Sequence, residues 1–323
     1  MLQVGDLEDG EGLAEAAGHG LSLSLPTSAG HSRRTGADSL RRMGETFTEG
    51  HYVLGIEGLA LLRAGAGRRF DRAGQRVREI EEIAGALEEH PYSERRDLPE
   101  YGVGAGYAEW AESYDDPGND TIALEQPIVR ALLDELPPGP VLDAACGTGR
   151  HAAYLAGAGR EVTGVDASEA MLDRARARLP EADLRVGELS TLPVADETFA
   201  GAVCALALSH LPEIGPAIAE LARVLRPGGR LVLSNPHPFV TGVLGWRAVF
   251  ARGGERAMIP ENAHRHSEYV TAFASAGLRV RRLVEPGLTR AQARARAKAG
   301  HGDAFEDALA GVPAVIVWEV ERG

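Results

Sequence analysis

Small residues and a carboxylate follow two consecutive apolar runs of the chain. The run Val141-Leu-Asp-Ala-Ala-Cys-Gly-Thr-Gly149 ends in glycines, which let a chain turn sharply out of a strand and bring main-chain atoms close to a bulky ligand. The next run, Gly164-Val-Asp-Ala-Ser168, places Asp166 near its end, where a carboxylate can accept hydrogen bonds from both hydroxyls of a ribose. Together these two motifs predict a site for a ligand that contains a nucleoside.

The glycine turn alone leaves the class of ligand open. Gly147-Thr-Gly149-Arg-His-Ala152 also fits the G-x-G-x-x-A form of the dinucleotide fingerprint. Further motifs follow in order: Glu188 after an apolar run, the apolar run Phe199 to Leu211, and a Leu-Arg-Pro-Gly-Gly-Arg turn into another strand pattern. In this order the motifs, over roughly residues 136 to 236, resemble those of the class I S-adenosylmethionine-dependent methyltransferases. The resemblance is specific for the superfamily and uninformative about the methyl acceptor.

The resemblance implies S-adenosyl-L-methionine as the cofactor and assigns roles to residues near the turn. Asp143 would fix the turn and meet the amino acid end of the cofactor, Asp166 would bind ribose, and Glu188 with the Leu189 amide would read the adenine edge. At Glu188 the family more often has Asp, and Ala145 stands where many relatives have another Gly. The residues placed at the cofactor in this way are Tyr114, Asp143, Ala145, Gly147, Gly149, Arg150, Asp166, Ala167, Met171, Glu188 and Leu189.

Two histidines are candidates for a catalytic base. Holding a sulfonium donor and its acceptor in line can supply much of the rate, so a strong base is optional in methyl transfer. His210 and His237 nevertheless follow the fourth and fifth predicted strands, at the carboxyl ends where open α/β sheets bind ligands. Because histidine titrates near neutral pH, we expect His237 or His210 to take the acceptor proton where a base is used.

An aromatic segment before the first motif predicts a lid. Tyr107-Ala-Glu-Trp-Ala-Glu-Ser-Tyr-Asp115 resembles a segment that packs over the cofactor in many small-molecule methyltransferases. A tyrosine face suits a sulfonium cation, and Tyr114 is the expected contact. Apolar residues at helical spacing from His51 to His90 predict two amphipathic helices, so residues 46–118 form a helical extension and lid. Residues 1–45, rich in Gly, Ser, Ala and acidic residues, are predicted to be a disordered arm.

The remaining chain, 119–323, predicts the cofactor-binding domain. Alternating strand and helix patterns favour an α/β, doubly wound, mostly parallel seven-stranded sheet with helices on both faces, a Rossmann-like methyltransferase fold. The runs at 277–284 and 312–320 are expected to form its antiparallel end. Ser168 is the expected cap of a helix. Residues 236–262 lose regular periodicity at prolines and glycines, and we expect this irregular insertion to shape the acceptor pocket.

Composition argues against several partners. The formal net charge of -13 opposes binding to a phosphate backbone, so we expect no nucleic acid. The sequence has neither an apolar run of the ~20 residues that span a membrane nor a signal-peptide pattern, which predicts a soluble cytoplasmic protein with no membrane partner. Cys146 and Cys204 lie in apolar surroundings and are expected to be packing residues. His264-Arg-His266 lacks a further ligand in sequence, so we expect no metal.

The expected function is S-adenosylmethionine-dependent methyl transfer to O, N or C of a small molecule, in secondary or quinone-like metabolism. Two other classes stay open: a nicotinamide-dependent oxidoreductase that uses the G-x-G-x-x-A turn, and a non-catalytic nucleotide-binding regulatory protein. Glu188 and the Arg226-Pro-Gly-Gly229 turn argue against the oxidoreductase, while the intact glycine turn and Asp166 argue against a non-catalytic protein. The oligomeric state is not indicated.

Overall fold

A computed structural model of the protein describes residues 47–67, 69–96, 98–116, 119–297 and 300–323. The arm predicted for residues 1–45 lies outside the described residues. Within the described part of the chain, no helix is long and apolar enough to cross a membrane. Cys146 and Cys204 are both free and buried, which confirms their interpretation as packing residues.

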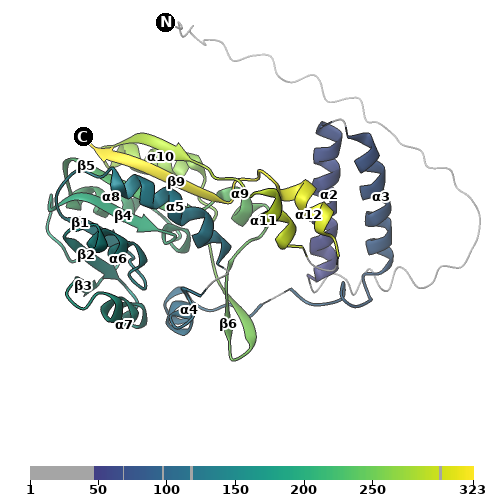
Figure 1. Cartoon of the computed structure of the whole chain (residues 1–323), viewed down its shortest axis with the longest axis horizontal. Coiled ribbons are helices and arrows are strands. Elements are labelled where there is room, and N and C mark those ends of the chain that lie inside the picture. The colour runs from purple at the N-terminus through teal and green to yellow at the C-terminus, as the bar shows by residue number, and fades with distance from the viewer. Residues whose placement is uncertain (1–46, 68, 97, 117–118, 298–299) are drawn as a thin grey trace, which may run out of the picture. The chain divides into compact units, whose positions relative to one another are not determined.

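A seven-stranded sheet forms the centre of the fold (Figure 1). Its strands lie in the order β3-β2-β1-β4-β5-β9-β8, and β9 runs antiparallel to both of its neighbours while β1 to β5 are parallel. The strands are β1 (Val141–Ala144), β2 (Val162–Asp166), β3 (Asp183–Val186), β4 (Phe199–Ala205), β5 (Leu225–Pro236), β8 (Leu278–Val284) and β9 (Val315–Arg322). The predicted doubly wound architecture with an antiparallel end is confirmed.

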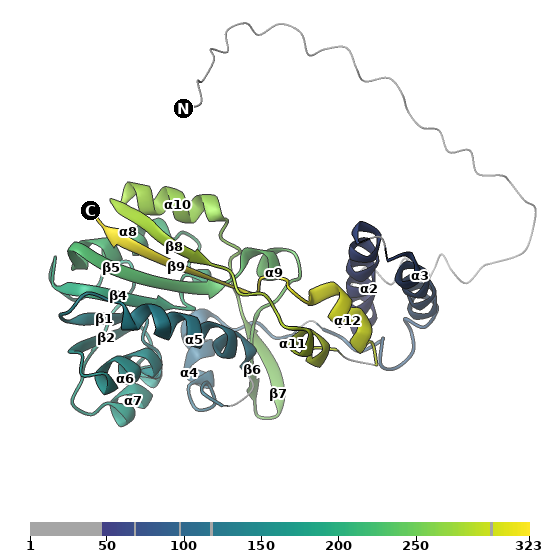
Figure 2. The same ribbon diagram turned by 45° about the horizontal axis from the view of Figure 1, so that its top comes forward.

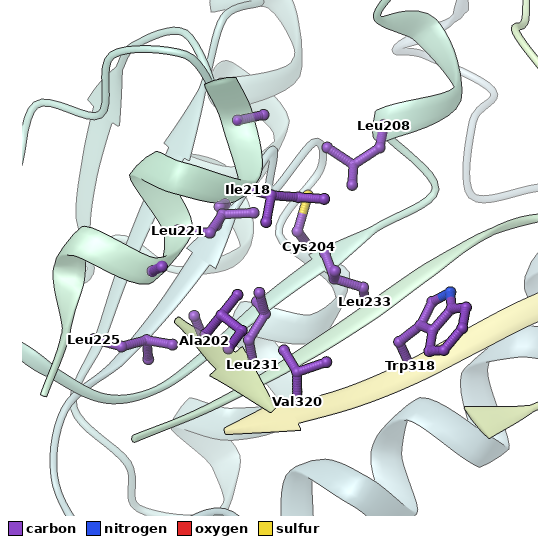
Figure 3. Close-up of a cluster of buried hydrophobic side chains, with 14 of the residues drawn as sticks. Ala202, Cys204, Leu208, Ile218, Leu221, Leu225, Leu231, Leu233, Trp318 and Val320 are labelled. Carbon is purple, nitrogen blue, oxygen red and sulfur yellow. The ribbon is translucent and has the colours of Figure 1, made fainter. Parts of the chain in front are cut away.

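Helices cover both faces of the sheet because its strands are apolar on both sides. In β5, Leu231 and Leu233 pack in one core while Val232 packs in the other, as the alternation of a strand requires. Helices α8 (Gly215–Val224) and α10 (His266–Ser275) cover the first face, and α5 (Asp120–Asp134) and α6 (Arg150–Gly157) cover the second (Figure 2). Figure 3 shows the first core, where Ile218 and Leu221 of α8 face side chains of β4, β5 and β9.

Polar caps set the starts of the helices next to the site. Helix α7 (Glu169–Arg178) begins after Ser168, whose side chain accepts a hydrogen bond from the Met171 amide at 3.4 Å, which confirms the predicted cap. Helix α5 begins after Asn119, whose side chain accepts from the Ile122 amide at 3.2 Å. The first cap fixes where the chain leaves the carboxyl end of β2, and the second fixes the start of the helix that precedes β1.

A second core joins helices from the two ends of the described chain. Helices α2 (Glu49–Ala66) and α3 (Phe70–Gly85) confirm the two predicted amphipathic helices. They pack with α11 (Arg290–Ala295) and α12 (Gly302–Leu309), which lie between β8 and β9 in sequence (Figures 1 and 2). Arg63 of α2 also donates hydrogen bonds to the Ala308 and Ala310 carbonyls at 2.6 and 2.8 Å. The helical layer is therefore built from segments that are far apart in sequence.

The expectation that residues 236–262 are irregular was wrong. The segment contains the short helix α9 (Pro238–Gly242) and a hairpin of β6 (Ala248–Arg252) and β7 (Glu255–Ile259). Gly253 and Gly254 form its turn with φ of 58° and 89°, the left-handed conformation that a two-residue hairpin turn requires. The hairpin packs against α4 (Val103–Trp110) through Phe250, Ala257 and Ile259. The Gly-Gly pair was the sequence signal for this hairpin.

Candidate active site

The glycine turn leaves a patch of main chain open at the end of β1. Gly147 and Gly149 adopt φ of 54° and 78°. A Cβ added at Gly147 would meet no heavy atom within 4 Å, whereas one at Gly149 would lie 3.2 Å from the Ala175 Cβ of α7. Gly149 is therefore required by packing and by conformation, and Gly147 leaves room for a ligand. Ala145 has φ of 57°, which costs a residue with a side chain roughly 1–2 kcal/mol.

Asp143 joins β1 to the first turn of α6. Its Oδ2 accepts a hydrogen bond from the Ala152 amide at 2.8 Å, and its side chain is buried. Burial raises the pKa of Asp143 to about 7. This geometry accounts for the expected part of Asp143 in fixing the turn, and its contact with the cofactor stays a prediction.

Two carboxylates, those of Asp166 and Glu188, lie near each other at the carboxyl edge of β2 and β3. Asp166 accepts hydrogen bonds from the Gly147 amide through Oδ2 and from the Ser168 amide through Oδ1, both at 2.8 Å. Burial raises the pKa of Asp166, and the neighbouring Glu188 carboxylate raises it further. Glu188 itself is exposed. A ribose offers hydroxyl donors and adenine an amino donor, so this pair of acceptors beside the open glycine turn fits a nucleoside.

The apolar residues expected at the cofactor surround these carboxylates. Ala167 is exposed directly after Asp166, and Leu189 is half-buried beside Glu188. Met171 is buried in the first turn of α7. Their positions next to the two carboxylates are those the resemblance implied, and their contacts with the cofactor stay predictions.

Arg150 is held by α5 in this structure. Its Nη1 donates to Glu125 Oε2 at 2.9 Å and to Gln126 Oε1 at 3.2 Å. The fully buried Glu125 also accepts hydrogen bonds from His151 and from Ser234. Burial alone would raise the pKa of Glu125. The hydrogen bond from His151 and the charge of Arg150 outweigh burial and hold this pKa below its usual value. This network connects α5 and α6 to β5. Because the partners of Glu125 are far from it in sequence, no sequence motif marks Glu125.

The aromatic segment predicted as a lid docks beside the glycine turn. Asp115 pairs with Arg178 of α7 at 2.6 Å, and Arg178 also donates to the Thr148 carbonyl at 3.1 Å. Burial raises the pKa of Tyr114 to about 12, and the charges of Arg150 and Asp166 lie close enough to influence it. The ring centroids of Tyr114 and Trp110 lie 5.0 Å apart. Tyr114 therefore lies within electrostatic range of Arg150 and Asp166.

A cavity of about 860 Å³ is lined in part by this segment. Leu206 and Pro236, which follow β4 and end β5, form part of its wall, and the 236–262 segment forms another part. Further lining residues come from the aromatic segment, α2, α9, the hairpin and α11, and include Tyr52, Tyr107, Trp110, Tyr114, Val240, Trp246, Arg247, Val249, Arg256, Met258, Glu261 and Arg296. Tyr114 lines this cavity as well as lying near Asp166, so the cavity adjoins the nucleoside site.

His210 reaches this cavity only through Tyr107. Its Nδ1 lies 2.9 Å from the Pro260 carbonyl, which can only accept, so Nδ1 carries the proton and Nε2 accepts from the Tyr107 hydroxyl at 2.7 Å. Burial lowers the pKa of His210, which favours the neutral ring. A role for His210 as base would therefore pass through the Tyr107 hydroxyl, and it stays a prediction.

His237 lies outside the set of residues that line the cavity. Its Nδ1 accepts from the Phe239 amide at 3.1 Å at the start of α9, and its Nε2 donates to Glu285 Oε1 at 2.9 Å. His266 donates to the same Glu285 oxygen at 2.7 Å. His237 is thus a capping residue with both ring nitrogens engaged, and this geometry favours a structural role.

We therefore expect His237→Ala to lower the free energy of unfolding by about 1–2 kcal/mol through loss of the cap and of the Glu285 hydrogen bond. Turnover should fall by less than about threefold, because both ring nitrogens bond to groups that are not among the residues lining the cavity. Chemical denaturation and turnover of the same preparation check both values. A loss of about 100-fold or more with unchanged stability would instead support His237 as the base.

His237, His266 and Glu285 are also the described residues that could converge on a metal ion, with ligand atoms within 4.8 Å of one another. These three residues are far apart in sequence and form no motif, and His264 is hydrogen-bonded to the Leu211 carbonyl at 2.8 Å. A metal-bound histidine normally donates its second ring nitrogen to an acceptor, whereas Nδ1 of His237 accepts from the Phe239 amide. This arrangement fits a hydrogen-bonded cluster better than a metal site.

Comparison with known proteins identifies the family. A sequence family described as a methyltransferase domain matches residues 142–233. A demethylmenaquinone methyltransferase of Renibacterium salmoninarum is 32% identical over 177 residues, which cover 53% of this chain and 73% of the relative. The chain belongs to the class I S-adenosylmethionine-dependent methyltransferases. A malonyl-[acyl-carrier protein] O-methyltransferase of Pseudescherichia vulneris is 33% identical over 155 residues, which cover 46% of this chain and 60% of that protein.

A solved structure supports the same fold. In the complex between the Haloferax volcanii Trm112 methyltransferase activator and a methyltransferase, the matching chain has a TM-score of 0.50 and 19% identity. The match covers 67% of this chain and 96% of that chain, and at this identity it bears on the fold alone. Membership in the methyltransferase family makes S-adenosylmethionine the cofactor and the protein an enzyme. The nicotinamide-dependent and the non-catalytic alternatives are set aside.

One acidic residue of the cavity, Glu261, was not predicted from the sequence. It follows β7 in the segment that was expected to be irregular, and its Oε1 accepts a hydrogen bond from the Ser209 hydroxyl at 3.3 Å. Burial raises the pKa of Glu261 to about 7. A glutamate between two loops shows no pattern in sequence, because its environment comes from η1 (Leu208–His210) and from the start of the hairpin.

Proposed function

We propose that this methyltransferase transfers the methyl group of S-adenosylmethionine to O, N or C of a small molecule bound in the 860 Å³ cavity. The observation that carries the proposal is the position of Tyr114, which lines the cavity and also lies near Asp166 and Arg150. When bound, S-adenosylmethionine supplies an electrophilic methyl group on a sulfonium. The open main chain at Gly147 and the carboxylates of Asp166 and Glu188 would hold its nucleoside.

Alignment of the reactants is the main contribution that we assign to the chain. The aromatic segment is joined to α7 through Asp115 and Arg178, and the packed rings of Trp110 and Tyr114 line the cavity, so we assign the orientation of the acceptor to this segment. Such positioning can supply several kcal/mol of a displacement barrier, of the roughly 7–11 kcal/mol available to well-oriented reactants. The half-buried aromatic side chains of the wall would also limit the access of water to the reacting groups.

The cavity wall favours an acceptor with an apolar body and an acidic group. Two arginines of the wall are neutralised by carboxylates, since Arg96 pairs with Glu49 and Arg296 with Asp120. Arg247 and Arg256 line the cavity, are exposed, and form no ion pair in the described part of the chain. Arg247 donates to the Thr241 and Trp246 carbonyls through Nη1, and a guanidinium without an ion-pair partner is suited to a carboxylate or a phosphate. The net charge of -13 supports a small acceptor over a nucleic acid.

A panel of acceptors tests the proposal. The purified protein is incubated with S-adenosylmethionine and hydroxylated benzoic and naphthoic acids, each beside its neutral amide. We expect release of S-adenosylhomocysteine together with an equal amount of methylated product, and faster turnover of the acids than of the amides. Turnover of the amides at the rate of the acids would contradict the role given to the arginines, and cofactor binding without any acceptor-dependent product would count against the proposed cavity.

Tyr114 provides a second prediction, because its ring should contact the sulfonium. We expect Tyr114→Ala to weaken binding of the cationic S-adenosylmethionine about 2- to 30-fold more than binding of neutral S-adenosylhomocysteine, which corresponds to about 0.5–2 kcal/mol of cation–π attraction. Titration calorimetry with both ligands measures the difference. Tyr114→Phe keeps the aromatic face and serves as the matched control. Equal weakening of both ligands by Tyr114→Ala would show that the ring covers the cofactor without contacting the sulfonium.

A further inference from the structure

We propose that Glu261 is the base that takes the proton from the attacking atom of the acceptor. The inference rests on the proposed function, because it requires that the acceptor bind in the cavity that Glu261 lines. It also implies an acceptor whose attacking atom carries a proton, such as a hydroxyl or an amine, rather than a free carboxylate.

Hydrogen bonds hold Glu261 at the carboxyl edge of β4 and β5. The Asn262 amide donates to the Ser209 carbonyl at 2.6 Å, and the Ser209 amide donates to Asn235 Oδ1 at 3.0 Å. The Ser209 hydroxyl donates to Glu261 Oε1 at 3.3 Å. Because Asn235 lies in β5 and Ser209 lies in η1, which follows β4 in sequence, the carboxylate is fixed to the sheet rather than carried on a free loop. Leu206 and Pro236 of the same edge line the cavity with it.

Glu261 is better placed for this role than either histidine. Both ring nitrogens of His237 have partners outside the cavity, and those of His210 are bonded to Pro260 and Tyr107. The Tyr107 hydroxyl donates its hydrogen bond to His210 and not to Glu261. The Glu261 carboxylate can therefore take a proton from the methyl acceptor. Glu261 needs no intermediate group to reach a molecule in the cavity.

The charges that face Glu261 come from several elements. Burial raises its pKa to about 7, while the Ser209 hydroxyl of η1, the charge of Arg247 before β6, and the Ala248 backbone oppose that rise. Tyr107 of α4 lies close enough for the Glu261 charge to raise the tyrosine pKa, which burial already holds well above its usual range. His210 lies next to Ser209 and is favoured in its neutral form. A carboxylate poised near neutral pH can both accept a proton and release it afterwards.

The step balances without any further reactant. The lone pair of the acceptor atom attacks the methyl carbon of S-adenosylmethionine, and the C–S bond breaks with its electron pair on sulfur. The proton of the acceptor atom passes to Glu261 Oε. The products are the methylated acceptor and S-adenosylhomocysteine, and Glu261 returns its proton to water before the next turnover.

Glu261→Gln is the central variant of the test. With the fastest hydroxylated acid of the acceptor panel, we expect kcat to fall by about 10²- to 10⁴-fold, while the dissociation constants of S-adenosylmethionine and S-adenosylhomocysteine change less than about twofold. The base acts when deprotonated, so the wild-type kcat/KM should rise with pH and level off above about pH 7. This acidic limb should be absent in Glu261→Gln. The exposed Glu255→Gln on the same hairpin is the matched control and should keep both kcat and the limb.

Two further measurements separate catalysis from folding. Glu261→Asp keeps a carboxylate and should recover part of kcat together with the acidic limb. Arg247→Gln removes a positive charge near Glu261 and should move the limb to higher pH, because the neutral carboxyl is then favoured. In ¹³C NMR spectra of the enzyme without acceptor, the carboxyl signal of Glu261 is assigned by its absence from Glu261→Gln. This signal should titrate near pH 7.

The outcomes distinguish this inference from the proposed function. If the wild type methylates no acceptor of the panel, the proposed function fails and the base assignment falls with it. If the wild type is active and a folded Glu261→Gln keeps kcat within threefold with the same acidic limb, the inference is overturned while the function stands. If Glu261→Gln does not fold, either of two other results overturns the assignment of Glu261 as the base. One is an acidic limb of kcat/KM in Arg247→Gln at the same pH as in the wild type, and the other is a Glu261 carboxyl signal that titrates below pH 5.

Discussion

Replacing Asp166 by alanine is expected to weaken binding of S-adenosylmethionine by a factor of about 5 to 150, which corresponds to about 1–3 kcal/mol for polar groups left unpaired. The Asp166 carboxylate accepts from the Gly147 amide and the Ser168 amide at 2.8 Å, and so orders both the glycine turn and the start of α7. The substitution would leave two amides without partners and would remove the expected acceptor for the ribose hydroxyls. The loss should therefore be similar for S-adenosylmethionine and S-adenosylhomocysteine, which share the ribose.

Titration calorimetry with both ligands measures this effect. Asp183→Ala is a suitable control, because Asp183 begins β3 at the opposite end of the strand and its exposed carboxylate pairs with Arg185. We expect the control to bind both ligands as the wild type does. Unchanged affinity in Asp166→Ala would mean that the ribose is held elsewhere, and the carry-over of family roles to Asp166, Ala167 and Glu188 would then have to be abandoned together.

The parts of the fold that could be predicted from sequence depend on local patterns. Apolar runs that end in glycine and acidic residues marked β1, β2 and β3, and the serine before α7 marked a helix start that the structure confirms. Spacing sufficed there because each strand end and cap is fixed by residues that are near in sequence. The Gly253-Gly254 turn is equally local, because two adjacent glycines between apolar runs favour a two-residue hairpin turn.

The parts that could not be predicted depend on contacts between distant residues. Arg150 was correctly placed beside the glycine turn by sequence, but its pairing with Glu125 of α5 follows from the packing of α5 on α6. His237 was correctly placed at the end of β5, but its direction is set by Glu285, which follows β8. The same holds for Glu261, whose pKa follows from burial by η1 and the hairpin. Residue type and strand end predicted where chemistry would lie, while the partners decided which residues remained available for it.

The second large effect is expected in Phe305 of α12. Its side chain is 1% exposed and packs in the second core with Val53, Ile56 and Ala60 of α2. Truncation of a fully buried phenylalanine to alanine costs about 3–5 kcal/mol, since the transfer free energy is lost and a cavity remains. We therefore expect Phe305→Ala to lower the free energy of unfolding by that amount in chemical denaturation. Leu62→Ala is the control on α2, because Leu62 is 73% exposed and should change stability by less than about 0.5 kcal/mol.

Phe305→Ala should also separate the two halves of the site. Tyr52 of α2 and Arg296, directly after α11, line the acceptor cavity, and both helices pack in the core that contains Phe305. Asp166, Glu188 and the glycine turn belong instead to the sheet and its edge. Where the variant is still folded, we expect the KM of the acceptor to rise while the dissociation constant of S-adenosylhomocysteine stays within about twofold of the wild-type value, since only the wall of the cavity is loosened. If cofactor affinity fell as much as acceptor affinity, the helical layer would support the nucleoside site as well as the acceptor cavity.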